Sequence, residues 1–407
     1  MVLNQIKNWS VYNQFKQTAR YILAIANRFI ICPVLWIIYK TTGTKVSVLY
    51  SARIAHLAYN GAAFFYRLKV QMNEVDKKRL VFSADPCNRQ LFEMWKRYIP
   101  ILESRVLFFW FNADIHYLRS KPYIEYLPFL HTEFEEMDQM PALEFTAREQ
   151  KKGKALLETM GIPDNAWFIC FQARDDMYHH KVRGTTGTHP HRNSEIDTYL
   201  KAARMIGERG GYALRMGAWA DEPLSVTRDP HIIDYARDHR SDFGDIYLFG
   251  NAKFFLASSA GTFPVSTLFK VPVILANQTP PRLWPIGRYS LMAPKMMVYK
   301  GTNALVPFSE LEKMGAFDYN FSELVRWDMP ETFEDYGIVP RDNSADELVE
   351  ASLDMLDALD GQGPSEDARE VQQFYKSKYC KSAASAAEFG PELAPSFALK
   401  YRDIILN

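Results

Sequence analysis

The sequence predicts an α/β protein built from two domains. Short runs of β-branched and aromatic residues alternate with helical patterns along most of the chain, which is typical of parallel sheets covered by helices. A chain of 407 residues is long enough for two domains of ordinary size. A charged helical stretch at 145–160 stops at Gly161-Ile162-Pro163, between two sets of strand patterns. Two Rossmann-like domains that face a cleft are the architecture that fits.

The first predicted domain covers residues 45–145. Its strands are expected at 46–50, 80–83 and 106–111, and its helices after 54 and at 90–98. His56 follows the first strand at the start of a helix, a position from which a general base would face the cleft. A purely structural histidine is the alternative reading of the same pattern.

The second predicted domain covers residues 146–360. Strands are expected at 167–171, 212–216, 245–249, 254–257 and 273–275, with helices at 194–209 and 264–269 between them. An amphipathic helix at 345–360 closes this domain, and residues 361–407 are expected to form a C-terminal helix and tail.

Residues 1–44 form a separate apolar segment. Of the 19 residues at 21–39, 16 are apolar, and Asn27, Arg28 and Pro33 interrupt them. A central arginine costs about 2.5–3.5 kcal/mol on membrane insertion scales. We therefore expect an in-plane or re-entrant amphipathic helix at a membrane surface, with a buried helix of the first domain as the alternative. The predicted location is cytoplasmic, peripheral at the inner face of the cytoplasmic membrane.

Charge and cysteine usage exclude some functions. Lys plus Arg and Asp plus Glu both number 48, so the whole chain offers no basic excess for binding nucleic acid. The cysteines, Cys32, Cys87, Cys170 and Cys380, lie far apart and match neither a zinc site nor a disulfide framework. We predict no cofactor, no metal and a reducing compartment.

A first candidate site lies in the segment FICFQARDD, residues 168–176. Four apolar residues predict a central parallel strand, and polar groups follow at its carboxyl end, where open α/β sheets bind ligands. The planar fork of Arg174 suits a pyrophosphate, and Asp175 either orients Arg174 or acts on a hydroxyl. A plain surface ion pair between these two residues explains the pattern equally well.

A second candidate site is the turn Ser258-Ser259-Ala260-Gly261-Thr262, which follows the strand at 254–257 and precedes a helix near Pro264. Its small residues allow backbone amides to approach an anion, and Ser258, Ser259 and Thr262 offer hydroxyls to phosphate. Further donor-binding candidates are Arg215, Gly217, Asp242 and Asp245. The last two resemble a metal-binding pair only loosely, and capping of a short helix is their alternative role.

One predicted loop is rich in histidine and basic residues. It contains His179, His180, His189 and His191 together with Lys181, Arg183 and Arg192. A metal site is the alternative reading, but the histidine spacings match no metal-ligand pattern, so we expect a mobile loop that covers the donor.

Several motifs carry a family resemblance. The segments SARIAHLAYN (51–60), NRQLFEMWKR (88–97), HRNSEIDTYLKA (191–202), RGGYALRMG (209–217) and the stretch 241–264 together resemble a family of bacterial glycosyltransferases encoded in surface-polysaccharide gene clusters. A more distant likeness is to the fucosyltransferases of the GT-B fold, in which a strand-end His-x-Arg binds the donor β-phosphate. Arg174 matches that arginine, whereas Gln172 stands where the histidine would be.

The resemblance implies a GT-B-like, metal-independent glycosyltransferase. Its substrates would be a nucleotide-sugar and a glycan or lipid-linked acceptor of the polysaccharide or lipopolysaccharide type, and its mechanism an inverting displacement with His56 or Asp175 as base. Arg174 and the turn 258–262 would stabilise the departing diphosphate. The alternatives are a nucleotide-sugar epimerase of the same fold, a pyruvyltransferase, and a non-catalytic, membrane-attached organiser of polysaccharide assembly.

Overall fold

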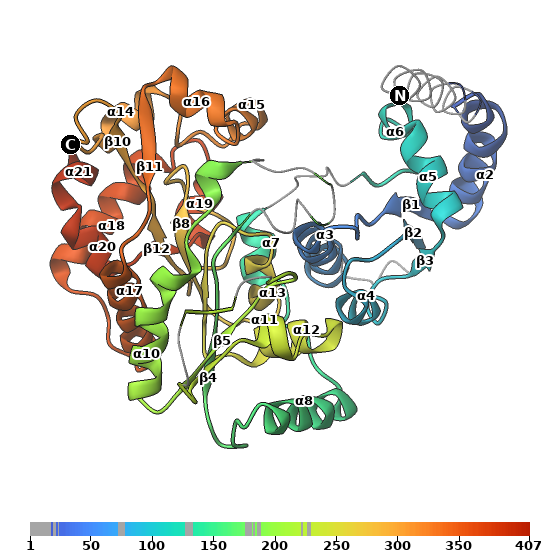
Figure 1. The fold of residues 1–407 in the computed structure, drawn as a ribbon. Helices are drawn as coiled ribbons and strands as arrows, with labels where there is room; N and C mark the ends of the chain where they lie inside the picture. The colour runs from blue at the N-terminus through green and yellow to red at the C-terminus, as the bar shows by residue number, and fades with distance from the viewer. Residues whose placement is uncertain are drawn as a thin grey trace, which may run out of the picture. The chain divides into compact units, whose positions relative to one another are not determined.

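The computed structural model describes residues 18, 22, 24–71, 78–126, 133–175, 181, 184, 189–220, 223–225 and 229–407. The chain forms two compact units, residues 1–131 and 132–407 (Figure 1). The sequence placed this boundary at 145. The residues between these two boundaries, 132–145, belong to the second unit. The Phe134 ring packs edge-on against Tyr319 with the ring centroids 5.7 Å apart, and Leu143 N donates to Leu268 O at 2.8 Å.

The first unit contains a small parallel sheet with the strand order β1-β2-β3. The strands are β1 (Lys45–Val48), β2 (Arg79–Ser83) and β3 (Ile101–Glu103). The helical elements are η1 (Asn27–Ile31) and η2 (Arg67–Gln71), both π-helices, and α2 (Cys32–Thr42), α3 (Ile54–Tyr66), α4 (Arg89–Trp95), α5 (Arg105–Ala113) and α6 (Ile115–Leu118). The strands predicted at 46–50 and 80–83 are therefore confirmed.

The strand predicted at 106–111 is wrong, because these residues form helix α5. The Ser104 hydroxyl caps the helix by accepting a hydrogen bond from Leu107 N at 3.3 Å. Trp110 and Phe111 are both buried although they are consecutive, which a two-residue strand period does not allow on a one-sided sheet. A short apolar run does not by itself distinguish a strand from a helix.

The second unit contains a sheet of seven strands in which all neighbouring pairs are parallel. The strand order is β12-β9-β8-β7-β4-β5-β6, with β4 (Phe168–Gln172), β5 (Tyr212–Arg215), β6 (Ile232–Ile233), β7 (Phe255–Ala257), β8 (Val273–Gln278), β9 (Leu291–Pro294) and β12 (Glu392–Leu393). From β4 the chain proceeds outward through β5 and β6, then returns to β7 and proceeds the other way. The order therefore reverses between β4 and β7, the type of position at which doubly wound sheets bind ligands.

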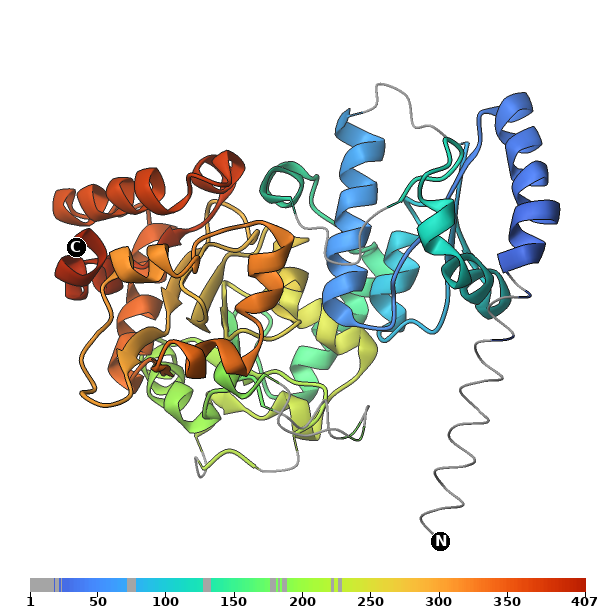
Figure 2. The ribbon, with the colours of Figure 1, turned by 90° about the horizontal axis from the view of Figure 1, so that it is seen from above.

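Helices cover this sheet, and a two-stranded antiparallel ribbon, β10 (Met296–Tyr299) with β11 (Ile338–Arg341), lies between β9 and β12 in the sequence. In Figure 2 the C-terminal helices, in red, gather at one end of the unit. The helices are α7 (Phe134–Gln139), α8 (Ala147–Thr159), η3 (Pro190–Arg192), η4 (Ile196–Tyr199), α10 (Leu200–Glu208), α11 (Tyr235–Asp238), α12 (Asp242–Asn251), α13 (Phe263–Thr267), α14 (Phe308–Lys313), α15 (Phe321–Arg326), α16 (Pro330–Asp335), α17 (Ala345–Leu359), α18 (Glu366–Tyr379), α19 (Ala384–Phe389), α20 (Pro395–Lys400) and α21 (Arg402–Leu406).

One predicted strand of the second unit is wrong. Residues 245–249 lie in helix α12, which Ser241 caps by accepting from Gly244 N at 3.0 Å. The strands expected near 167–171, 212–216, 254–257 and 273–275 are confirmed as β4, β5, β7 and β8. The C-terminal segment also contributes to the sheet, since β12 pairs with β9 at its edge. The chain is thus an α/β protein with one large parallel sheet.

Candidate anion-binding site

The ends of β4 and β7 bring the two predicted site segments together. Gln172, the last residue of β4, is in register with Ala257, the last residue of β7. Beyond these strands, Ser258 N donates to Gln172 O at 3.0 Å and Arg174 N donates to the Ser258 hydroxyl at 2.6 Å. Segments separated by 84 residues in sequence are thereby joined at the carboxyl edge, where the strand order reverses.

The Arg174 side chain fixes the segment 189–194 at this edge. Arg174 is buried, and its Nη1 donates to His189 O at 3.3 Å and to Asn193 Oδ1. Its carbonyl accepts from Ser194 N at 3.0 Å. Both of these acceptors are neutral oxygens, and the two bonds hold the guanidinium against the segment 189–194.

The guanidinium that contacts the 258–262 turn belongs to Arg192. Its Nε donates to the Ser259 hydroxyl at 3.1 Å and its Nη2 to Ser259 O at 2.9 Å, while Nη1 donates to Asp328 Oδ1 at 3.2 Å. The Arg192 side chain is 26% exposed, so solvent reaches it. Arg192 was expected in a covering loop and not in the site, although its place in the motif HRNSEIDTYLKA was an available signal.

The hydroxyls of the turn have partners within the protein. Ser258 and Ser259 are buried, Ser258 accepts from the backbone of Arg174, and Thr262 donates to Gln172 Oε1. The helix after the turn, α13, has only five residues, so the partial charge at its start is small. The charged donors at this edge are therefore the guanidiniums, and the hydroxyls chiefly shape the turn.

Lys295 adds a third cation to the edge. Its Nζ donates to Asn193 O and to Asp342 Oδ1, both at 2.6 Å, and the side chain is 2% exposed. Burial lowers the pKa of Lys295; the ion pair with Asp342 opposes that shift, and the charge of Arg174 adds to it. The Asn193 carbonyl and amide thus connect two cations at one end of the sheet.

Three potential metal ligands also converge beside Arg192. His189, His191 and Asp328 each offer a ligand atom, and these atoms lie within 4.8 Å of one another. The nearest His191 nitrogen is 3.8 Å from Asp328 Oδ1, too long for a hydrogen bond, and burial lowers the pKa of His191. Arg192 already pairs with the same carboxylate, and its charge opposes a second cation there. His179, His180 and Arg183 lie outside the described residues.

The other predicted donor-binding residues form separate contacts. Arg215, at the end of β5, pairs with Asp234 at 3.1 Å, and both side chains are nearly buried. Asp242 and Asp245 begin helix α12. Asp245 accepts from the Tyr235 hydroxyl at 3.1 Å, and burial raises its pKa to about 6.

An exposed aromatic residue follows Gly217 at the same edge. Trp219 comes four residues after the end of β5 and is 45% exposed. Large aromatic rings left in solvent beside a ligand edge offer a flat face for stacking. Trp219 was not predicted as a site residue, because a tryptophan in a loop gives no periodic signal.

The two candidate bases come from different units. Asp175 is exposed and directly follows Arg174, whereas His56 is a nearly buried residue in the first turn of α3 in the first unit. Both stay predictions.

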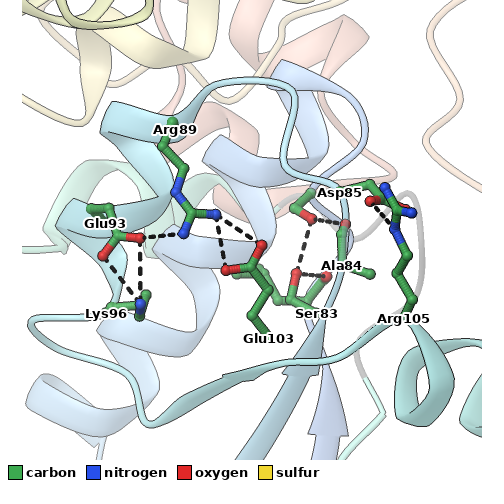
Figure 3. Close-up of polar contacts among 10 residues, drawn as sticks. Ser83, Ala84, Asp85, Arg89, Glu93, Lys96, Glu103 and Arg105 are labelled. Carbon is green, nitrogen blue, oxygen red and sulfur yellow. Dashed lines mark hydrogen bonds and ion pairs between the residues drawn. The ribbon is translucent and has the colours of Figure 1, made fainter.

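The first unit has a polar edge of its own at the ends of β1 and β2 (Figure 3). The Ser83 hydroxyl donates to Leu49 O at 2.9 Å, and the Ser51 hydroxyl to Ala84 O at 2.6 Å. Asp85, which has a φ of 48°, pairs there with the exposed Arg105 at 2.6 Å. This edge therefore presents an accessible carboxylate that sequence reasoning did not single out.

No family model matches the chain, and no curated protein matches it. Solved structures that resemble it include a family 9 glycosyltransferase of Veillonella parvula, at 9% identity and a TM-score of 0.39 over 62% of this chain and 86% of that one. The ADP-heptose lipopolysaccharide heptosyltransferase II of E. coli gives 11% identity and a TM-score of 0.40, over 72% and 99%. An iron-containing dodecameric glycosyltransferase of enterotoxigenic E. coli gives 11% identity and a TM-score of 0.33, over 61% of this chain and 59% of that one.

Proposed function

We propose that the protein is a glycosyltransferase that moves a sugar from a nucleotide-sugar donor to a cell-surface polysaccharide, lipopolysaccharide or related glycan. The observation that carries this proposal is the meeting of Arg174, Arg192 and the 258–262 turn where the sheet order reverses. A diphosphate is the ligand that best suits two guanidiniums and a small-residue turn at such an edge.

In this proposal Arg192 binds the donor phosphates directly. Its two bonds to Ser259 end on neutral oxygens, and an anionic phosphate oxygen is a stronger acceptor for the same N–H groups. Arg174 holds Asn193 and adds positive charge behind the site. The exposed ring of Trp219 is the proposed stacking face for the nucleotide base.

The proposed reaction is a direct displacement. The acceptor oxygen forms a bond to the anomeric carbon while the bond from that carbon to the β-phosphate oxygen breaks. The acceptor proton passes to a base, for which Asp175 and His56 are the candidates, and the nucleoside diphosphate leaves with the bonding electrons. Arg174 and Arg192 stabilise the negative charge that grows on it, which makes a metal unnecessary in this scheme.

The first test is a thermal-shift panel of nucleoside diphosphates on the full chain. A ligand present at 100 times its dissociation constant adds about 2.7 kcal/mol of stability, which a melting curve detects readily. The nucleoside diphosphate that stabilises the protein most then identifies the nucleobase of the donor to use in a transfer assay. Arg174→Ala should lower turnover by about 10²–10³, the loss typical of one charge-stabilising donor.

The outcomes separate the proposal from its alternatives. Conversion of the donor to an isomer without acceptor would identify an epimerase, and binding without transfer to any acceptor would identify an organiser. A chelator should leave transfer unchanged. If it abolishes transfer, the cluster of His189, His191 and Asp328 becomes the first place to seek the metal. No response to any nucleotide would refute the donor site itself.

A further inference from the structure

The zero net charge of the chain conceals a strong asymmetry between its two units. The first unit, residues 1–131, carries 18 Lys and Arg against 7 Asp and Glu, a net charge of +11. The second unit carries the remaining 30 and 41, a net charge of −11. No Asp or Glu occurs before Glu74, although nine Lys and Arg do. An anionic partner is therefore attracted to the first unit and repelled by the second.

The same unit exposes a long apolar helix. Residues Ala24–Thr42 form 19 consecutive helical residues, a length of about 28 Å at 1.5 Å per residue, and only 17% of the apolar window is buried. The outward side is apolar: Phe29 is 77% exposed and Ile30 64% exposed. Further exposed apolar residues of this helix are Ile25, Val34, Trp36, Ile37 and Ile38.

The inward side of this helix packs on the first unit. Cys32 is part of the hydrophobic core there, and Ile31, Leu35 and Tyr39 pack against that core. Asn27 is buried, and Arg28 forms an ion pair with Asp114 at 3.2 Å. By length and composition this helix is long and apolar enough to cross a membrane, but its packing along one side of its own domain favours a different placement. Its geometry is that of a helix lying in the plane of a surface.

We propose that the outward side of η1 and α2 docks the protein on an anionic lipid bilayer, with the helix in the plane of the membrane. Lipid covers the exposed apolar side chains, and the basic excess of the first unit contacts the headgroups. The end of the helix supports this arrangement, because Lys40 Nζ lies 5.9 Å from the ring of Trp36, and both residue types favour the boundary between headgroups and acyl chains.

A second copy of the chain is a less suitable occupant of this surface. Two copies that met through this helix would bring together two units of net charge +11, with no acidic residue among the first 73 positions to offset the repulsion. An anionic bilayer satisfies both the charge and the apolar surface. This inference does not depend on the proposed glycosyl transfer.

The test measures binding of the full chain to vesicles by co-sedimentation. Vesicles of phosphatidylcholine with 30% phosphatidylglycerol, about a third anionic, should bind the protein, and binding should weaken in pure phosphatidylcholine and at high salt. Phe29→Glu combined with Ile30→Glu should lower the vesicle partition coefficient by about tenfold or more, because it removes apolar burial and adds negative charge. The matched control is Tyr289→Glu combined with Phe321→Glu, which alters residues that are 80% and 67% exposed in the second unit.

Two further measurements keep the outcome clear. The melting temperature reports on folding and should be unchanged in the Phe29/Ile30 variant, and so should any shift that a nucleoside diphosphate produces in the natural protein. Equal vesicle binding by this variant and its control would overturn the proposal. The proposal would also be overturned if the natural protein bound no vesicles and formed a dimer that the Phe29/Ile30 variant converted to a monomer. The surface would then belong to a second copy of the chain.

Discussion

Replacing Arg192 with alanine tests the donor site at its most accessible contact. In the free protein Arg192 donates two hydrogen bonds to Ser259 and one to Asp328. Its side chain is 26% exposed and that of Asp328 is 41% exposed, so loss of this ion pair should cost the fold no more than about 1 kcal/mol. The variant should therefore fold.

The expected effect on nucleotide binding is larger. A hydrogen bond to a charged partner contributes about 1.5–3 kcal/mol, which corresponds to about a 10- to 150-fold change in dissociation constant. Arg174 and Lys295 remain in the variant, so the loss should not exceed this range. Arg192→Lys should fall between the two proteins, because an ammonium keeps the charge but cannot present two parallel N–H groups.

The measurement is isothermal titration with the nucleoside diphosphate that stabilises the protein most. Arg402→Ala is the matched control, since Arg402 also forms an ion pair, at 2.7 Å with Glu370, but lies in the last helix. A dissociation constant within twofold of the natural protein in both variants would show that Arg192 does not contact the phosphates. The reasoning from Ser259 would then be wrong, even if nucleotides bind elsewhere.

Three other predictions follow from single residues. Trp219→Ala should weaken nucleotide affinity by about 1–3 kcal/mol if the base stacks on this ring, as judged by the same titration, with no change in melting temperature. Gly153→Ala should destabilise the protein by about 1–3 kcal/mol in urea, because the added Cβ would lie 1.9 Å from the Tyr247 ring, whereas Gly301→Ala meets no atom within 4 Å and should be nearly neutral. The pKa of Asp245 is raised to about 6 by burial, so the folded state holds its proton more tightly than the unfolded state. The stability from this proton is present below about pH 4 and is lost as the pH rises through 6, so natural protein should lose about 2–3 kcal/mol relative to Asp245→Asn between pH 4 and 7.

The strands around the site could be predicted because each is a short apolar run with an abrupt polar end. This pattern located β4, β7 and β8, and with them the positions of Arg174 and Ser258. It failed at 106–111, where the run is as apolar as a strand but Ser104 caps a helix. It also missed β12, since two residues carry no period and the strand exists only through its pairing with β9.

The site itself was only half predictable, for a different reason. Arg174 and Ser258 follow adjacent strands, and their meeting follows from a parallel sheet. Arg192 reaches Ser259 across 67 residues and Asp328 across 136 residues, from a segment with no regular period. Contacts of this kind depend on how irregular segments fold over the sheet edge, and neither propensity nor spacing encodes that.

Net charge illustrates how an average over the chain can mislead. Electrostatic attraction is screened over about 8 Å at physiological salt, which is shorter than the width of a domain. A partner at the first unit therefore interacts mainly with charges near its own contact surface, and the charges of this unit are predominantly basic, 18 Lys and Arg against 7 Asp and Glu. The zero total thus gives no ground for excluding polyanions from the first unit. What favours a bilayer over nucleic acid is the apolar side of η1 and α2, since phosphodiester chains gain nothing from contact with Phe29 or Ile30. If the partner is a polyanion held by charge alone, the affinity difference between the natural protein and the Phe29/Ile30 variant should disappear as salt is added. If the partner is a bilayer, the variant should bind more weakly than the natural protein at every salt concentration.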